Sequence, residues 1–270
     1  MTISAADVEP WLHRMFIDAA GTSLREEDKK KAIEVAALLN ELARVGTSGA
    51  LVDVAAGKSY VGLLAVELLG FSDVTVIERD EKQLANAKHG ATKLTRTDVR
   101  LVVRGSISTP RDADDAKHEH PRLSLCAGDV RDVSLWPVDA RVAIGLHACG
   151  PASDGVIDAA IEREVKWLLL VPCCYSSLVS QWEAAHRRAE ELGIADGEVR
   201  KQFVQSFIDS ERALRLEAAG YETECVSFVA PTVTPHHVLF RARRLMNPKR
   251  MAAAVGRRAR LLTTAGVPGR

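Results

Sequence analysis

The nine residues Leu51-Val-Asp-Val-Ala-Ala-Gly-Lys-Ser59 decide how the rest of the chain is interpreted. Residues 51–54 are too apolar to alternate between a buried and a solvated face, which is typical of a parallel strand covered by helices on both sides. Residues 55–57 are small, so a ligand can approach their backbone closely. The apolar segment 60–69 is predicted to be a helix. Asp53 therefore lies near the carboxyl end of a buried strand, where open α/β sheets bind ligands.

The composition is that of an ordinary globular protein. The 270 residues are 47% hydrophobic and 27% charged, which suits one large domain or a domain with extensions. No run approaches the roughly 20 apolar residues that span a bilayer, and residues 1–11 are acidic and lack the hydrophobic segment of a secretory signal. The five cysteines are an odd number, which fits a reducing cytoplasm better than a disulfide framework.

The formal net charge of zero hides an asymmetry. Residues 241–270 carry nine basic residues and no acidic one, so this segment is +9 and the remainder is −9. Such a segment can contact phosphate groups, and each contact makes the affinity salt-dependent. It can equally be a solvated, poorly ordered tail, and both interpretations stay open.

Strands and helices alternate along the chain after residue 50. The expected strands are 51–54, 74–77, 123–126, 140–146, 165–171, 222–229 and 237–243, with a further candidate within 98–107. The expected helices between them are 60–69, 82–95, 153–163, 181–192 and 198–219. This order predicts an α/β fold, with a doubly wound, mostly parallel, seven-stranded Rossmann-like sheet whose last two strands form an antiparallel hairpin.

Residues 7–45 are expected to form helices that precede the sheet. Ser23 followed by Glu26 matches a capping box that would start the second helix, and the glycines within 46–49 would end it. This N-terminal helical cap could cover an edge of the sheet or form a roof over the ligand site.

Three acidic residues fall at the ends of three successive expected strands: Asp53, Glu78 and Asp129. Glu78 lies 21 residues after Gly57, the distance at which nucleotide-binding α/β proteins place the acid that binds ribose hydroxyls. Asp129, beside Val130, could accept a hydrogen bond from an adenine amino group. Together the acids would hold an adenosine moiety; alternatively, they are helix caps or surface charges.

The turn does not suit a ligand that binds through phosphates. A phosphate-binding loop ending in Gly57-Lys58-Ser59 needs a glycine at position 52, where Val52 stands. A dinucleotide fingerprint needs three glycines, and only Gly57 and Gly62 are present. S-adenosylmethionine fits better, because it has adenine, ribose and an amino-acid end but no phosphate.

Three spaced motifs together resemble a known family. Residues 53–60, Asp-Val-Ala-Ala-Gly-Lys-Ser-Tyr, look like motif I of class I S-adenosylmethionine-dependent methyltransferases, in particular of the methyltransferase-like 25 group. Residues 146–150, Leu-His-Ala-Cys-Gly, and 172–175, Pro-Cys-Cys-Tyr, strengthen the resemblance. The same pair is similar to eukaryotic-type tRNA ribose 2′-O-methyltransferases. The resemblance covers roughly residues 51–175 and implies methyl transfer from S-adenosylmethionine.

The chain is expected to have three parts: an N-terminal helical cap at 1–47, a methyltransferase domain at 48–245 and a basic C-terminal tail at 246–270. The residues expected to bind the cofactor are Asp53, Ala55, Gly57, Glu78, Asp129, Val130 and His147. RNA, contacted by the tail, is the favoured methyl acceptor. The alternatives are a small molecule, a protein side chain, or a non-catalytic binding module that keeps the cofactor fold.

His147 and Tyr175 are the candidate catalytic residues. His147 leaves the fourth of the core strands where the methyl group should lie, and an ordinary imidazole suits proton transfer near neutral pH. It could instead shape the cofactor pocket. Tyr175 could line the acceptor pocket, stack on a base or orient a nucleophile.

The cysteines and the other histidines receive no such role. Cys149, Cys173 and Cys174 are expected to be small packing residues, with a catalytic thiolate as the alternative. No metal is expected, because adjacent cysteines rarely ligate one zinc ion and no Cys-x-x-Cys pair exists. The remaining histidines near the motifs lack supporting ligands: His118, His120, His236 and His237.

Overall fold

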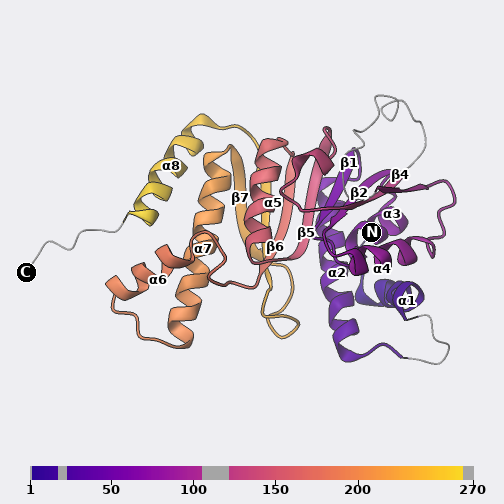
Figure 1. Ribbon diagram of the computed structural model, residues 1–270, viewed down its shortest axis with the longest axis horizontal. Coiled ribbons are helices and arrows are strands. Elements are labelled where there is room, and N and C mark those ends of the chain that lie inside the picture. The colour runs from indigo at the N-terminus through magenta and orange to yellow at the C-terminus, as the bar shows by residue number, and fades with distance from the viewer. Residues whose placement is uncertain (1, 18–22, 105–121, 264–270) are drawn as a thin grey trace, which may run out of the picture.

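The computed structural model describes residues 2–17, 23–104 and 122–263 (Figure 1). The helices are α1 (Ala5–Phe16), α2 (Glu26–Val45), α3 (Tyr60–Leu69), α4 (Glu81–Ala91), α5 (Pro151–Glu162), α6 (Trp182–Glu191), α7 (Glu198–Ala218) and α8 (Pro248–Leu262). The strands are β1 (Ala50–Val54), β2 (Asp73–Glu78), β3 (Arg100–Arg104), β4 (Arg122–Ala127), β5 (Ala140–Cys149), β6 (Trp167–Cys173), β7 (Tyr221–Ser227) and β8 (Val238–Arg244). The two histidines of the polar insertion, His118 and His120, and residues 264–270 lie outside the described residues.

The strands form one sheet in the order β3-β4-β2-β1-β5-β6-β8-β7. β1 pairs in parallel with β2 and β5, and β8 runs antiparallel to both β6 and β7. The predicted doubly wound α/β sheet with an antiparallel edge hairpin is confirmed. The predicted count of seven strands is wrong, because the candidate within 98–107 forms β3 and pairs in parallel with β4 at the sheet edge.

Helices cover both faces of the sheet (Figure 1). Helices α1 to α4 share a hydrophobic core with the face on which β1 places Leu51. Helices α5 and α7 share a second core with the opposite face, which receives Val52 and Val54. Every residue of β1 is therefore buried, as its unbroken apolar run predicts.

The N-terminal helices form as expected, but the predicted capping box is wrong. Helix α2 begins at Glu26 after Arg25, and the Asp28 carboxylate accepts a hydrogen bond from the Arg25 backbone N–H at 3.2 Å, so Ser23 takes no part. The helix is followed by Gly46 as its C-cap. Gly46 has a φ of +90°, a conformation that glycine adopts easily because it has no side chain.

The described part of the basic segment is ordered. Helix α8 packs along α7, and the Arg258 guanidinium donates at 2.8 Å to Glu211, an acid of α7 that is fully buried. Arg250 pairs with Glu222 of β7 at 2.6 Å. Much of the positive charge is thus neutralised by acids of the domain itself, and the expectation of a poorly ordered tail does not hold for residues 248–262.

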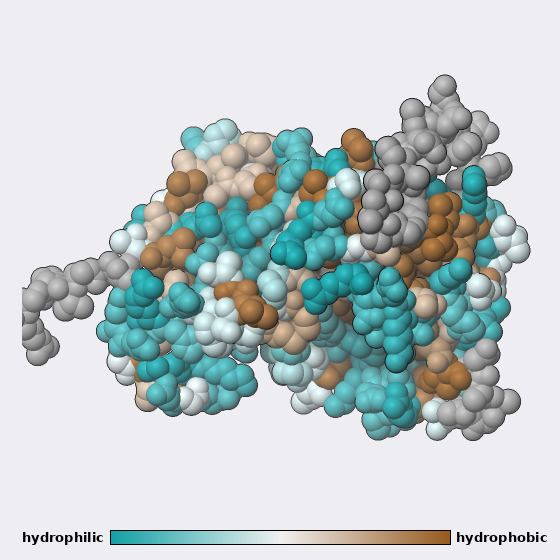
Figure 2. Space-filling model, viewed as in Figure 1, coloured by the Kyte–Doolittle hydropathy of each residue, from teal (hydrophilic) through white to brown (hydrophobic). Residues whose placement is uncertain are grey.

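The surface is mixed in character. Figure 2 shows hydrophobic residues in separate patches between broad hydrophilic areas on this face. Within the described ranges, no helix combines the length and the apolar character needed to cross a membrane.

Candidate active site

The connection from β1 to α3 is a sharp turn with unusual backbone. Ala55 has a φ of +50° and Ser59 a φ of +55°, a left-handed conformation that is uncommon for residues with a side chain. Gly57, between them, has a φ of +56°. Backbone strain of this kind gathers at ligand sites, where the surrounding structure maintains it. The turn therefore presents its backbone at the carboxyl edge of the sheet.

The carboxyl group of Asp53 anchors this turn through hydrogen bonds. Its side chain is buried, and Oδ2 accepts hydrogen bonds from Ser59 Oγ at 2.7 Å and from the Gly62 backbone N–H at 2.9 Å. Burial raises the pKa of Asp53 to about 7, although these two hydrogen bonds oppose the rise. A cationic ligand beside this carboxyl group would favour its charged form.

Gly62→Ala is expected to break this arrangement. A Cβ at residue 62 would lie 2.6 Å from Ser59 Oγ and 2.7 Å from Asp53 Oδ2, so both side chains would have to move. Overpacking of this kind costs about 1–3 kcal/mol of unfolding free energy, which urea unfolding would measure. Gly256→Ala in α8 is the matched control, because its Cβ meets nothing nearer than 3.6 Å, and removing a helical glycine should stabilise by about 0.5–1 kcal/mol. Equal effects of the two substitutions would contradict the packing at Gly62.

A cavity of about 320 Å³ lies above this turn. It is large enough for a small-molecule ligand, since such pockets begin at roughly 300 Å³. Its lining comes from α2, β1, the β1–α3 turn, α3, α4 and β5: Lys31, Asp53, Ala55, Ala56, Gly57, Lys58, Tyr60, Val61, Gln83, Leu146 and His147. Four of the predicted cofactor residues thus line one cavity, namely Asp53, Ala55, Gly57 and His147.

Glu78 does not line the cavity, but it holds the backbone of Gly57, which does. Its Oε2 accepts a hydrogen bond from the Gly57 backbone N–H at 2.7 Å, and its Oε1 accepts one from the Asp80 N–H at 2.9 Å. Both oxygens keep a free lone pair, so the predicted ribose contact remains a prediction.

Asp129 and Val130 are not among the residues that line the cavity. The Asp129 carboxylate is held by the Arg131 guanidinium through two contacts of 2.8 Å, and these hydrogen bonds lower the pKa of Asp129 to about 2. Val130 is buried in the core, where its carbonyl oxygen accepts a hydrogen bond from Trp136 Nε1 at 2.8 Å. Contact of these two residues with an adenine remains a prediction.

His147 is held by a residue that the sequence did not reveal. Its Nε2 lies 2.8 Å from Oε2 of Glu34, a buried acid on α2 that Lys31 also contacts. Burial alone would raise the pKa of Glu34, but the hydrogen bonds from His147 and Lys31 hold it below its ordinary value. Helix α2 therefore forms a wall of the site, which favours the roof interpretation of the N-terminal cap. The one sequence signal is the spacing of Lys31 and Glu34 by about one helical turn.

The backbone at His147 explains how its ring reaches the cavity. The parallel pairing of β5 with β6 is regular up to Leu146 and shifts at His147, which has a φ of +60°. A bulge re-aims a side chain in this way. Nδ1 of His147 is buried without a hydrogen-bond partner among the residues the structure describes. The ring of His236 lies edge-on at 5.9 Å, a neighbour the sequence did not predict.

Tyr175 lies apart from this cavity. Its hydroxyl donates to the Asp209 carboxylate at 2.7–2.8 Å, and the Arg212 guanidinium lies 5.6 Å from its ring centroid. Burial and the nearby Asp209 charge both raise the pKa of Tyr175. The structure therefore ties Tyr175 to α7, and its proposed catalytic role remains a prediction.

A second cavity of about 280 Å³ shares Lys58 and Tyr60 with the first. The Lys58 ammonium lies 5.4 Å from the ring centroid of Phe16 and 5.9 Å from that of Tyr60. An aromatic and cationic lining of this kind suits a planar, electron-rich group.

The comparison with family models identifies the class of protein. Residues 28–181, more than half of the chain, match the family described as "Methyltransferase domain". The matched range includes Glu34 of α2, the turn after β1 and the Cys-Cys-Tyr segment after β6. The chain belongs to this methyltransferase family.

Individual relatives are distant. The chain is similar to a glutathione S-transferase C-terminal domain-containing protein of Homo sapiens, with 21% identity over 224 residues, 73% of this chain and 31% of that protein. It thus spans about a third of the length of the curated relative. Among solved structures it is similar to magnesium protoporphyrin IX methyltransferase from Synechocystis PCC 6803 with bound SAH (11% identity, 87% and 94% coverage of this chain and that chain, TM-score 0.46). It is also similar to the tRNA (uracil-54, C5)-methyltransferase of Pyrococcus abyssi (12% identity, 78% and 38% coverage, TM-score 0.38).

Proposed function

We propose that this protein transfers a methyl group from S-adenosylmethionine to an acceptor bound beside the carboxyl ends of β1 and β5. The observation that carries the proposal is the buried Asp53 beneath a strained turn of small residues, at the floor of a cavity large enough for a small-molecule ligand. The donor is a cation with no phosphate, so a carboxyl group and a compact turn suit it.

Methyl transfer does not require the protein to form a covalent bond with the donor or the acceptor. The sulfonium supplies the activated methyl group, and the chain positions donor and acceptor for an in-line displacement in a site with little water. An acceptor hydroxyl or protonated amine must also lose a proton.

We propose that His147 is the base that accepts this proton from the acceptor. If Nε2 carries its hydrogen toward Glu34, Nδ1 keeps the lone pair that can take up a proton. Glu34 is then a positioning residue that fixes the tautomer and orientation of the ring and stabilises the imidazolium, as a carboxylate does in a catalytic triad.

RNA is the proposed acceptor class. Support comes from the similarity of residues 146–150 and 172–175 to tRNA ribose methyltransferases, from the aromatic second cavity, and from the basic segment. Within residues 122–263, Lys249 and Arg260 are exposed basic residues of α8 with no ion-pair partner among the described residues. A small molecule or a protein side chain is the competing acceptor, and either would be methylated without regard to these two cations.

The double substitution Lys249→Glu and Arg260→Glu is expected to weaken RNA binding by about tenfold. Removing two phosphate contacts should also lower the slope of log affinity against log salt by about 1.4 for single-stranded RNA. Fluorescence anisotropy with labelled RNA at several salt concentrations measures both. Lys30→Glu, at an exposed lysine of α2, makes the same kind of charge change elsewhere and serves as the control. An unchanged salt slope in the double variant would remove α8 from the RNA site.

A further inference from the structure

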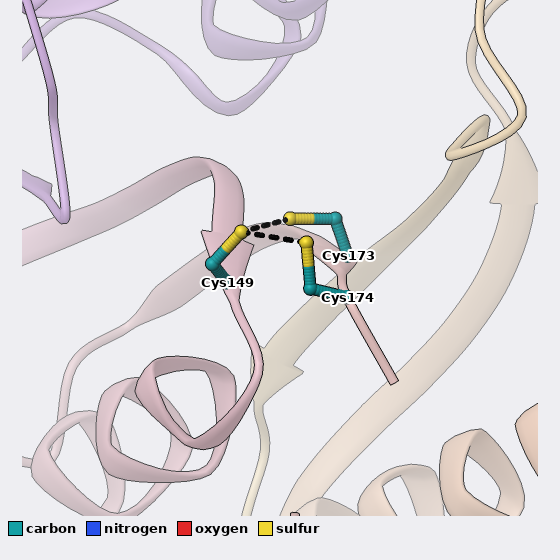
Figure 3. Close-up of side chains that lie close together, drawn as sticks. All are labelled: Cys149, Cys173 and Cys174. Atoms are coloured by element: carbon teal, nitrogen blue, oxygen red, sulfur yellow. Dashed lines mark hydrogen bonds between the residues drawn. The ribbon is translucent and has the colours of Figure 1, made fainter. Parts of the chain in front are cut away.

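Three cysteines meet where β5 and β6 end, and one of them, Cys149, is two residues after His147, which lines the cavity. Cys149 is the last residue of β5 and pairs in register with Cys173, the last residue of β6, while Cys174 follows directly. Figure 3 shows the three side chains pointing toward one another from these two chain segments. The Sγ of Cys149 lies 3.0 Å from that of Cys173 and 2.9 Å from that of Cys174, and all three sulfur atoms lie within 4.8 Å of one another.

Two backbone irregularities produce this meeting. In a regular strand, adjacent side chains point to opposite faces, so Cys173 and Cys174 could not both face Cys149. Cys174 has a φ of +54°, which breaks the alternation. On the other strand, the bulge at His147 sets the register that places Cys149 opposite Cys173. Left-handed backbone at two non-glycine residues beside one cluster is the kind of strain that marks functional sites.

A packing role does not explain the cluster. Cys173 is buried, but Cys149 and Cys174 are exposed, so two of the three thiols fill no core space. The thiol of Cys173 is also 3.4 Å from the carbonyl oxygen of His147, which can accept its hydrogen.

We propose that Cys149, Cys173 and Cys174 bind one soft metal cation, Zn²⁺ in the first instance, as three thiolates with one coordination position open to solvent. Soft thiolate ligands select zinc and related ions over Mg²⁺ or Ca²⁺. Zinc–sulfur bonds of about 2.3 Å in a tetrahedral site separate the sulfurs by about 3.8 Å. The sulfur–sulfur distances of 3.0 and 2.9 Å must therefore widen by less than about 1 Å, a movement that the exposed Cys149 and Cys174 can make.

Binding balances as an exchange of protons for the metal. Each thiol that becomes a ligand releases one proton, so the ion displaces up to three protons, and no oxidant or reductant is involved. The ion would tie the ends of β5 and β6 together two residues from His147. It would thereby stabilise the bulge that aims the His147 ring into the cavity.

The test is metal binding by the full-length, reduced protein after treatment with a chelator. We expect one equivalent of Zn²⁺ by calorimetry, with proton release seen as heat that depends on the buffer, and a rise in melting temperature. Substituting Co²⁺ or Cd²⁺ should give the ultraviolet charge-transfer absorption of metal thiolates. Cys174→Ser and Cys149→Ser should each weaken binding at least tenfold, because each replaces one of the three thiolate ligands with a hydroxyl group. Both positions are exposed, so neither substitution disturbs the core.

Cys225→Ser is the matched control, since Cys225 is exposed on β7 and outside the cluster; it should bind the metal like the wild type. The proposal is overturned if the wild type takes up no stoichiometric metal, or if binding survives Cys149→Ser. The proposal is also overturned if the protein is isolated with a Cys149–Cys174 disulfide and takes up no metal once that disulfide has been reduced. Titration with S-adenosylhomocysteine in parallel tests the donor cavity separately, because the three cysteines do not line that cavity.

Discussion

Asp53→Asn is expected to weaken binding of S-adenosylmethionine by about 10- to 100-fold, and Asp53→Ala to abolish measurable binding. A charge-assisted hydrogen bond contributes about 1.5–3 kcal/mol, and asparagine keeps the size of the side chain but not its negative charge. Alanine also removes the acceptor for Ser59 and Gly62, so the turn itself loses its anchor. Equilibrium dialysis with labelled donor measures the affinities. Asp158→Asn, at an exposed position of α5 on the other face of the sheet, is the control and should bind normally.

The same substitution should change how stability depends on pH. The folded-state pKa of Asp53, raised by burial to about 7, lies above its unfolded value near 3.8. Between these values the folded state binds more protons than the unfolded state, so stability falls as the pH rises through this window. Relative to the wild type, Asp53→Asn should therefore gain about 2 kcal/mol in unfolding free energy between about pH 5.5 and pH 8. Urea unfolding of the unliganded proteins at both pH values checks this; parallel curves would mean that Asp53 is ionised when folded.

Glu34→Gln and His147→Asn are expected to lower the rate of methyl transfer by about 10²- to 10⁴-fold, the usual contribution of a positioned acid–base group. Donor affinity should change little, because the loss concerns proton transfer and orientation. The double variant should be no slower than His147→Asn alone, since Glu34 acts through His147. Single-turnover transfer of labelled methyl groups to RNA gives the rates, and dialysis gives the affinities.

Glu27→Gln provides the matched control for Glu34→Gln. It lies on the same helix, in the first turn of α2, but is exposed and pairs only with Arg25 among the residues the structure describes. Its rate should equal that of the wild type. If His147→Asn loses donor affinity in parallel with rate, the ring shapes the pocket and does not serve as the base.

Much of the fold could be predicted because the signals were local. The unbroken apolar run of β1 reflects cover on both faces, and α3 forms over the predicted range, Tyr60–Leu69. Strand β3 was harder, because its apolar run of three residues lies between Arg100 and Arg104 and it is at the sheet edge. Helix α8 was missed although Asn247 and Pro248 are local signals of a helix start, because its basic composition equally suited a solvated tail. Its contacts with α7 and β7, such as Arg258 with Glu211, are distant in sequence.

The site could be predicted only in part, for the same reason. Asp53, Ala55 and Gly57 are close in sequence and sit in a recognisable turn, so their common cavity followed from the motif. Glu34 meets His147 across 113 residues, and the spacing of Glu34 from Lys31, the one local signal, does not indicate His147 as the partner. A metal site at the three cysteines was not expected from sequence, because adjacent cysteines rarely ligate one zinc ion and no Cys-x-x-Cys pair exists. What the sequence does not show is the left-handed backbone at Cys174, with which both adjacent thiols face Cys149.

The central claim, that the cavity above Asp53 binds the methyl donor, is tested most directly by titrating S-adenosylhomocysteine into the full-length protein in a calorimeter. We predict one site per chain with a dissociation constant in the range of about 1 µM to 1 mM typical of enzyme ligands, and loss of the binding heat in Asp53→Ala. A wild-type protein that gives no binding heat and no rise in melting temperature at millimolar ligand would contradict the claim.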